Sequence, residues 1–304
     1  MSIEHNIAVM RHWLVEGWTE GHVEVADDII SPNFTVHGAG GQKVEFGNQG
    51  VKGLVMAWRN AMPDGKMQVL DEIPSGNKVG VRLLWTGTHT GEPFYGVPAS
   101  GAKVIVSSIG IDGVGEDGKI AEGWGEVDML GMMTQMGAIP KMGPGAPPDP
   151  ASLQPSPAKP TSTSPAENLK VVLAFVEAVN KWDLNAAKAT VNPSSYVEHN
   201  PAWGAIGFDG TVQTYTMIRA SLPDLTFIPD EDNSFAADDK VVVRGTVTGT
   251  HTGEPLFGVP ASGKKLDWTG IDISRVTDGK ITERWLCADI LRLMTQLGLV
   301  PGQG

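Results

Sequence analysis

An internal duplication is the strongest constraint on how this chain can fold. The segment THTGEPFYGVPASG, which begins at Thr88, returns as THTGEPLFGVPASG, which begins at Thr250. A second segment, GKIAEGWGEVDMLGMMTQMG from Gly118, returns as GKITERWLCADILRLMTQLG from Gly279. A repeat of this length indicates two copies of one domain, and the 304 residues of the chain suffice for two hydrophobic cores. The chain can therefore be compared with itself, position by position.

The middle of the chain separates the two copies. Residues 141–164 are rich in Pro, Ser and Gly and have almost no large apolar side chains, which is typical of a semi-extended linker. We therefore expect one domain over residues 1–140 and a second over residues 165–304. The segment SPAE from Ser164 has the pattern of a capped helix start at the beginning of the second domain.

Each copy begins with helical patterns and continues with strand patterns. Apolar residues recur at helical spacing near the start of copy two, as in Leu169, Val172 and Val176. The later part of each copy alternates like strands, and residues 277–280 have the pattern of an Asp-Gly hairpin turn. Helices followed by an antiparallel sheet predict an α+β domain rather than a parallel βαβ design.

The composition excludes several classes of protein and site. The net charge of -12 argues against a nucleic-acid partner, and the lack of a long apolar run argues against a membrane partner. Cys287 is the single cysteine, so neither an internal disulfide nor a cysteine-rich metal site is expected. No two histidines have the spacing of metal ligands. Because the N-terminus has no signal-peptide pattern, we expect a soluble cytoplasmic protein.

Strand alternation predicts which side chains share a sheet face. Pairing across the turn at residues 277–280 places Asp272 opposite Trp285, and a bulge would change this register. The predicted face of copy two then holds Trp268, Gly270, Asp272, Trp285, Cys287 and Asp289, and that of copy one holds Val106, Ser108, Gly110, Trp124, Glu126 and Asp128. Arg284 falls on the opposite face in this register. Aromatic and carboxyl groups together suit a pocket for an apolar ligand with carbonyl or hydroxyl groups.

Asp128 and Asp289 occupy matched positions directly before the last helical pattern of each copy. One interpretation is structural, because Asp is a favoured N-cap residue that stabilises a helix by about 1 kcal/mol. The other is catalytic, because a carboxyl at a strand end in an apolar cavity has a raised pKa and can act as an acid or base. Glu126 and Asp272 would raise this pKa further by repulsion. The two interpretations are compatible.

His37 and His199 also occupy matched positions, shortly after the aromatic residue that begins a strand in each copy. A lone histidine more often makes a structural hydrogen bond, but both are candidates for supporting a catalytic carboxyl. Cys287 corresponds to Glu126 in copy one, so a nucleophilic thiol is not expected.

Both copies resemble the SnoaL-like polyketide (ester) cyclases of the nuclear-transport-factor-2-like superfamily. The motifs that carry the resemblance in copy two are YVEHNP from Tyr196, SLPDL from Ser221, GTHTGEPLFGVPASGK from Gly249, DGKITERW from Asp278 and D-x6-QLG from Asp289. Copy one matches them with FTVHG, AMPDG, GTHTGEPFYGVPASG, DGKIAEGW and D-x6-QMG from Asp128. The resemblance covers nearly all of the chain except the linker.

The resemblance implies two tandem cone-shaped, curved antiparallel sheets, each packed against N-terminal helices, with a pocket and without a metal or organic cofactor. In these cyclases an aspartate at the start of the closing motif is the general acid and base of an aldol ring closure, and it corresponds to Asp128 and Asp289. A histidine of the adjoining strand is replaced here by Asp272 in copy two and Gly110 in copy one, which leaves another proton transfer open. Because family members pair through their sheets, we expect the copies to form an internal pseudo-dimer, and a further homo-oligomer is an alternative.

The predicted function is that of a cofactor-independent cyclase or isomerase acting on a small, apolar, carbonyl-containing ligand. Asp289, supported by Asp272 and His199, is the preferred catalytic group, and Asp128 is its counterpart in copy one. The residues expected to contact the ligand are Trp268, Trp285, Trp124, Glu126, His37, Cys287 and Tyr196. Two alternatives stay open. One is an epoxide-opening hydrolase, like those of the same superfamily that activate water between acids, and the other is a non-catalytic binding protein.

Overall fold

The computed structural model describes residues 2–38, 42–140, 153–201 and 204–300. The chain divides into two compact units, the first built mainly from Met1–Lys141 and the second mainly from Pro157–Gly304. Within the predicted linker, residues 141–152 lie outside the described residues. Among the residues that are described, no helix is both long and apolar enough to cross a membrane.

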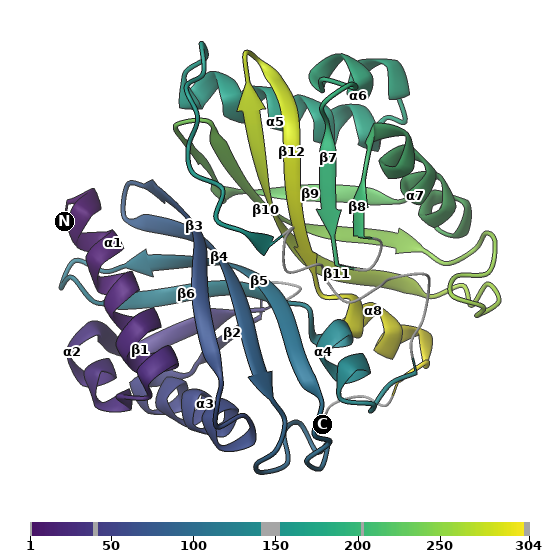
Figure 1. The fold of residues 1–304 in the computed structure, drawn as a ribbon. Coiled ribbons are helices and arrows are strands. Elements are labelled where there is room, and N and C mark those ends of the chain that lie inside the picture. Colours follow the sequence, from purple (N-terminus) through teal and green to yellow (C-terminus); the bar gives the residue numbers. More distant parts are fainter. Residues whose placement is uncertain (1, 39–41, 141–152, 202–203, 301–304) are drawn as a thin grey trace. The chain divides into compact units, whose positions relative to one another are not determined.

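Unit 1 begins with helices and continues with strands (Figure 1). Its helices are α1 (Ile3–His12), the π-helix η1 (Trp13–Glu20), the 3-10 helix η2 (Val23–Val25), α2 (Ala26–Ile29), α3 (Gly47–Ala61) and α4 (Met129–Gln135). Its strands are β1 (Ile30–His37), β2 (Lys43–Glu45), β3 (Lys66–Ser75), β4 (Lys78–Thr88), β5 (Lys103–Val114) and β6 (Ile120–Val127). They form one sheet in the order β2-β1-β6-β5-β4-β3.

Unit 2 repeats this arrangement. Its helices are α5 (Pro165–Asn180), α6 (Leu184–Thr190), α7 (Phe208–Ser221) and α8 (Ile290–Leu297). Its strands are β7 (Val197–Asn200), β8 (Gly204–Ile206), β9 (Thr226–Ala237), β10 (Lys240–Thr250), β11 (Lys265–Thr277) and β12 (Lys280–Ala288). The sheet order is β8-β7-β12-β11-β10-β9, which matches that of unit 1 strand for strand.

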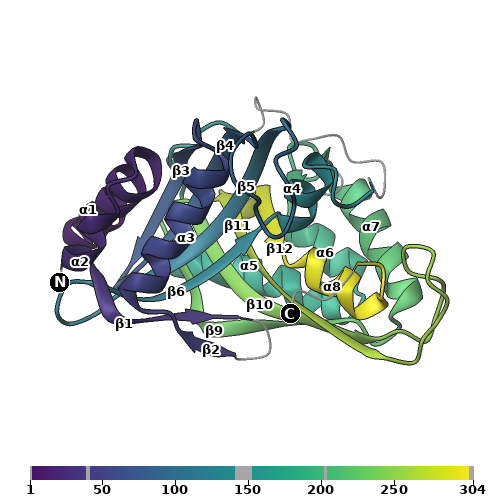
Figure 2. The same cartoon turned by 90° about the horizontal axis from the view of Figure 1, so that it is seen from below.

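The predicted α+β fold with two tandem cone-like sheets is confirmed. The sheets are mixed rather than purely antiparallel, because β1 runs parallel to β6 and β7 runs parallel to β12. In unit 1, α1 and α3 contact the sheet from the same side (Figure 2). In unit 2, the core joins Val172 and Phe175 of α5 to Val243 of β10 and Val276 of β11. We call the helix-covered face of each sheet the inner face and the opposite one the outer face.

Local sequence signals act where they are predicted. The Ser164 hydroxyl accepts a hydrogen bond from the backbone N–H of Glu167 (3.3 Å), and the Glu167 carboxylate accepts one from the backbone N–H of Ser164 (2.8 Å). This reciprocal capping begins α5. In the turn between β11 and β12, Asp278 and Gly279 have φ values of 49° and 73°, as a two-residue hairpin turn with the sheet's twist requires.

The described end of the predicted linker is anchored within each unit. In unit 1 the guanidinium of Arg82 donates to the backbone carbonyl of Gln154 (3.1 Å). In unit 2 the guanidinium of Arg275 donates to the backbone carbonyl of Pro157 (3.2 Å and 3.1 Å). Two buried arginines thus hold the backbone at Gln154 and Pro157, within the segment that its composition predicts to be a semi-extended linker.

Candidate functional site

One extra residue near the start of the last long strand decides which side chains share a face. In unit 2, Val276 pairs with Ile281 as predicted, but Arg275 pairs with Glu283 and leaves Thr282 as a bulge. A bulge shifts every later pair by one residue, and the period of two then moves each side chain to the other face. Unit 1 has an equivalent bulge between β5 and β6.

The bulge separates residues that the sequence analysis places together. Asp272 pairs with Leu286, whereas Trp285 pairs with Ile273. The residues that remain on the inner face are Trp268, Gly270 and Asp272 in unit 2, and Val106, Ser108 and Gly110 in unit 1. The residues that lie on the outer face instead are Trp285 and Cys287 in unit 2, and Trp124 and Glu126 in unit 1. The prediction of one shared pocket face was therefore wrong for these four.

His37 and His199 also belong to the outer face. The ring of His37 stacks on that of Trp124 with 4.4 Å between centroids, and the ring of His199 stacks on that of Trp285 with 5.5 Å. His199 Nε2 lies 3.0 Å from Oε1 of Glu283. His199 and Asp272 are thus on opposite faces of the sheet, contrary to the expected arrangement.

The inner face of unit 2 carries a buried arginine between two carboxyl groups. Arg284 Nη1 is 2.9 Å from Oε2 of Glu198, and its Nη2 is 3.1 Å from Oδ2 of Asp272. The adjacent strands β7, β12 and β11 supply the three side chains. None is more than 3% exposed, so each charge depends on the others for compensation. We expected Arg284 on the outer face, and the bulge brings it to the inner one.

Two tyrosines complete this group. Tyr215 of α7 lies 3.1 Å from Arg284 Nη1, which donates to its hydroxyl, and the Tyr196 hydroxyl donates to Glu198 Oε2 (3.1 Å). Burial raises the pKa of Tyr215 to about 12 and also raises the pKa of Tyr196, so both hydroxyls stay protonated at neutral pH. We call Glu198, Arg284, Asp272, Tyr196 and Tyr215 the acid–arginine cluster.

Unit 1 has none of this cluster's charged side chains at the matching positions. Strand pairing matches Val36 with Glu198, Gly123 with Arg284, Gly110 with Asp272 and Phe34 with Tyr196. The inner face of unit 1 is therefore apolar and built from small residues where that of unit 2 is charged and filled.

Tryptophans from three elements meet on the inner side of unit 1. The ring of Trp85 in β4 lies edge-on to Trp18 of η1 (4.7 Å between centroids) and to Trp58 of α3 (5.1 Å). Trp85 Nε1 donates a hydrogen bond to Oγ of Ser108 (2.7 Å). Trp18 reaches this group from a π-helix, a rare element that often occurs at functional sites.

Unit 1 also has an inner-face carboxyl that the sequence analysis missed. Asp112 in β5 pairs with Gly123 of β6, and unit 2 has Ser274 at the matching position. Burial raises the pKa of Asp112 to about 7. Among the residues that the structure describes, none forms a hydrogen bond or ion pair with this carboxyl.

Asp128 and Asp289 are the N-caps of α4 and α8. Oδ1 of Asp128 accepts a hydrogen bond from the backbone N–H of Gly131 (2.9 Å), and Oδ1 of Asp289 accepts one from the backbone N–H of Arg292 (2.9 Å). Both residues are half-buried. Burial raises the pKa of Asp128, against the opposing effect of the Gly131 N–H. The capping interpretation is confirmed, and it does not exclude a catalytic role.

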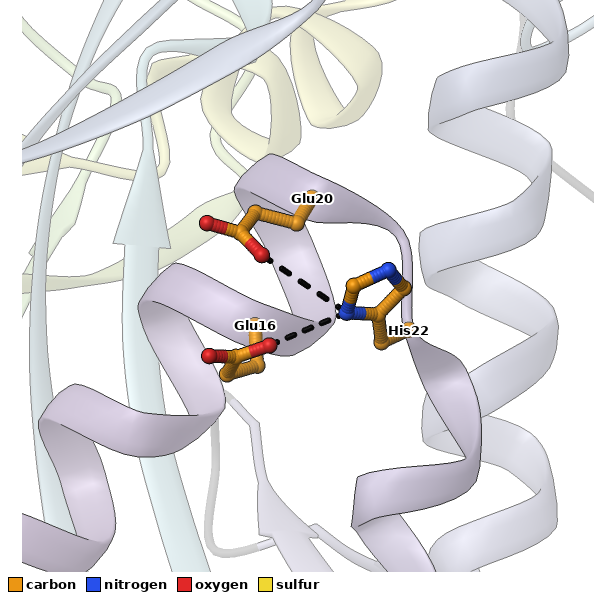
Figure 3. A group of neighbouring side chains, drawn as sticks. All are labelled: Glu16, Glu20 and His22. Atoms are coloured by element: carbon orange, nitrogen blue, oxygen red, sulfur yellow. Dashed lines mark hydrogen bonds and ion pairs between the residues drawn. The ribbon is translucent and has the colours of Figure 1, made fainter.

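A separate group at the end of η1 has the donor set of a metal site (Figure 3). His22 Nδ1 is 2.9 Å from Oε2 of Glu16 and 3.6 Å from Oε2 of Glu20. The hydrogen bond to Glu16 raises the pKa of His22. The group is largely exposed, and exposed ion pairs of this kind contribute little to stability.

Comparison with known proteins places the chain in a family. A sequence profile described as SnoaL-like polyketide cyclase matches residues 8–136 and again residues 170–297. The chain belongs to this family. Each unit therefore holds one SnoaL-like domain, and membership supports a cyclase or isomerase activity. No curated protein matches the sequence.

Several solved structures are similar to a single SnoaL-like unit. AclR from Streptomyces galilaeus, a candidate hydroxylase, is 28% identical over 46% of this chain and 85% of its own, with a TM-score of 0.42. IdmH from Streptomyces antibioticus, a candidate polyketide cyclase, is 26% identical over 43% of this chain and 98% of its own, with a TM-score of 0.39. TsrD from Streptomyces laurentii is 27% identical over 46% of this chain and 99% of its own, with a TM-score of 0.41.

Proposed function

We propose that this chain is a cofactor-independent cyclase or isomerase that acts on an apolar carbonyl compound in unit 1. The Asp128 carboxylate removes a proton from the carbon next to the ligand's carbonyl, which gives an enolate. In a cyclisation, the enolate carbon then attacks a second carbonyl of the same ligand and closes a ring. In an isomerisation, the enolate is instead reprotonated at another of its atoms. The Asp128 carboxylic acid returns the proton, so the enzyme ends as it began.

The surroundings of Asp128 carry this proposal. Burial raises its pKa, and a carboxylate with a raised pKa is a stronger base that also remains a usable acid near neutral pH. The inner face of unit 1 is apolar and built from small residues, and a Cβ added to Gly125 would have no atom within 4 Å, which leaves room for a ligand there.

We place the reaction in unit 1, although the sequence pattern favoured Asp289 of unit 2 as the catalytic group. Asp289 has the backbone position of Asp128, but the inner face along the strand from it, five residues away at Arg284, is filled by the acid–arginine cluster. An apolar ligand in unit 2 would have to displace or desolvate those charges, which is unfavourable. We therefore assign the proton transfer to Asp128 rather than Asp289.

Exchange of the α-protons of 2-tetralone for deuterium, followed by NMR, tests the proposal without knowledge of the natural substrate. Asp128→Asn keeps an oxygen for capping but removes the base, so we expect exchange catalysed by the protein to fall at least about 100-fold. Asp289→Asn is the matched control, with the same cap in unit 2, and should exchange at the wild-type rate. Wild-type exchange in Asp128→Asn would contradict the proposal.

A second candidate, an epoxide-opening hydrolase in unit 2, is favoured by the acid–arginine cluster. Arg284 holds two carboxyls on neighbouring strands, and Oε1 of Glu198 has no hydrogen-bond partner among the described residues. In such a site one carboxylate takes a proton from water, the hydroxide attacks an epoxide carbon, and a protonated acid supplies the alkoxide oxygen with its proton. The product is a diol.

Hydrolysis of cyclohexene oxide tests this second candidate. Glu198→Gln and Asp272→Asn should each abolish diol formation if unit 2 is a hydrolase, whereas Asp128→Asn should not affect it. A wild type that shows neither exchange nor hydrolysis would contradict both proposals for these model compounds and favour the binding protein.

A further inference from the structure

Asp112 is an inner-face carboxyl of unit 1 at a position where unit 2 has Ser274 instead. It faces Gly123 across the β5–β6 pair, and its Oδ1 lies 3.7 Å from where a Cβ on Gly123 would be. A side chain at position 123 would also meet the ring of Phe34 at 2.8 Å. Glycine at 123 therefore makes room for the Phe34 ring, and Asp112 beside it is partly exposed, whereas Ser274 of unit 2 lies beside a full arginine side chain.

Burial is the only cause that raises the pKa of Asp112, so no neighbouring charge contributes to it. Helix α1, which packs on β3 and β4, carries Glu4, His5, Arg11 and His12, and His5 Nε2 lies 3.1 Å from the carbonyl oxygen of Gly118 in the turn of the β5–β6 hairpin.

The neighbours of Asp112 across the sheet are Val79 of β4 and Gly123 of β6. The charged residues of these two strands lie on the outer face, where Lys78 covers the Trp124 ring and Arg82 pairs with Asp71. The outer-face acids of β6 are Glu122 and Glu126. Helix α4, which packs on β5, has no titratable side chain between its ends.

Open space and aromatic surface lead from this carboxyl along the inner face. A Cβ added to Gly125, which follows Gly123 on the same face of β6, would have no atom within 4 Å. Gly110 and Val36 are only partly buried, although Asp272 and Glu198 at their matching positions in unit 2 are almost fully buried. The Trp85 group flanks the same face.

We propose that Asp112 binds the polar end of the ligand in unit 1, donating a hydrogen bond from its protonated carboxyl to a carbonyl or enolate oxygen. The pKa of about 7 means that the carboxyl holds its proton for part of the time at neutral pH. Gly123, opposite Asp112, precedes Asp128 by five residues, so the backbone positions of the two acids are about 16 Å apart along the strand. The ligand that contacts both is consequently long, apolar in its middle and oxygenated at both ends.

The ligand class rests on the proposed function, but the binding role of Asp112 can be tested apart from it. The probe is 2-acetylanthracene, a flat ketone without a titratable group, and 2-ethylanthracene is the matched probe without the oxygen. Binding is followed by quenching of tryptophan fluorescence at pH 6.0 and pH 8.5. We expect the ketone to bind up to about tenfold more tightly at pH 6.0 than at pH 8.5, because a tenfold ratio corresponds to the free energy of one good hydrogen bond. The hydrocarbon should bind equally at both pH values.

Three variants decide the outcome. Asp112→Ser, which gives unit 1 the residue of unit 2, and Asp112→Asn should both lose the pH dependence of ketone binding. Asp117→Asn, a change to an exposed turn residue of the same hairpin, should keep it. Ketone binding with wild-type affinity and pH dependence in Asp112→Ser would overturn the proposal.

The two proposals fail separately. If Asp128→Asn retains α-proton exchange while ketone binding still depends on Asp112, only the catalytic assignment is wrong. If exchange depends on Asp128 but ketone binding is indifferent to Asp112 and to pH, only the binding role of Asp112 is wrong.

Discussion

Arg284 and Gly123 occupy the same position in the two sheets. Arg284 pairs with Ser274 on one side and Glu198 on the other, and Gly123 pairs with Asp112 and Val36. Because these two residues and their neighbours differ, the interior of unit 2 holds a buried arginine between two carboxyls, whereas the described part of the unit 1 inner face is apolar beside the carboxyl of Asp112. A duplicated domain has thus produced two interiors with different chemistry.

Removal of the arginine should destabilise unit 2 severely. Arg284→Met leaves Glu198 and Asp272 buried without their counter-charge, which costs about 3–5 kcal/mol in comparable buried pairs. We expect unit 2 to unfold at a lower urea concentration, seen as early loss of amide protection in β11 and β12 by hydrogen exchange. Adding Glu198→Gln and Asp272→Asn to Arg284→Met should recover part of the loss, because no unpaired charge remains. Equal stability of the single variant and the wild type would show that the cluster is not charged as described.

The raised pKa of Asp112 should make unit 1 less stable as the pH rises. The folded carboxyl keeps its proton up to about pH 7, whereas the unfolded one loses it near its ordinary value of 3.8. The unfolded state therefore binds fewer protons between these values, and the free energy of unfolding falls across the window, by on the order of 4 kcal/mol above pH 7.

Asp112→Asn should abolish the fall in the free energy of unfolding that the Asp112 carboxyl causes as the pH rises. We expect the stability of the variant relative to wild type, measured by urea unfolding, to increase between pH 4 and pH 8. Asp117→Asn, in the exposed turn, should show no such trend. A constant difference between Asp112→Asn and wild type at all pH values would mean that the carboxyl is ionised in the folded protein throughout.

The fold could be read from the sequence because its signals are local and repeated. The Asp278-Gly279 turn, the cap at Ser164 and the two copies of the closing helix lie where their patterns predict. The site could not, because Thr282 is a bulge that no residue type announces. Without it, period-two counting sends Arg284 to the outer face and Trp285 to the inner one, so Asp272 is separated from the arginine that it contacts.

A signal for the cluster was nevertheless present in the chain. Glu198, Arg284 and Asp272 are all replaced together in copy one, by Val36, Gly123 and Gly110, so that two acids and one base disappear at once. Acids and a base that disappear together indicate residues in contact, because a buried charge depends on its counter-charge. Asp112 could also have been found, because period-two alternation continues the predicted face of copy one from Gly110 to Asp112.

The outer-face histidine should be dispensable for proton transfer. His199 stacks on Trp285 and pairs with Glu283 on the face away from Asp272. We expect His199→Gln to exchange the α-protons of 2-tetralone at the wild-type rate, measured by NMR as above. A loss of more than about tenfold in a variant with wild-type circular dichroism would contradict the assignment of proton transfer to unit 1, because His199 belongs to unit 2.

The matched caps separate a structural role of the aspartates from a catalytic one. Asp→Ala at 128 or 289 removes the acceptor of the N–H at Gly131 or Arg292, so each should cost about 1 kcal/mol of stability. Asp→Asn keeps that acceptor and should cost only a few tenths in either unit, because Asn caps about as well as Asp. If capping alone matters, Asn therefore restores both stability and exchange at position 128. If Asp128 is the base, Asp128→Asn is more stable than Asp128→Ala but still lacks α-proton exchange. Neither substitution at position 289 reduces exchange, because the reacting unit stays intact. Urea unfolding and α-proton exchange on these four variants give the two answers independently.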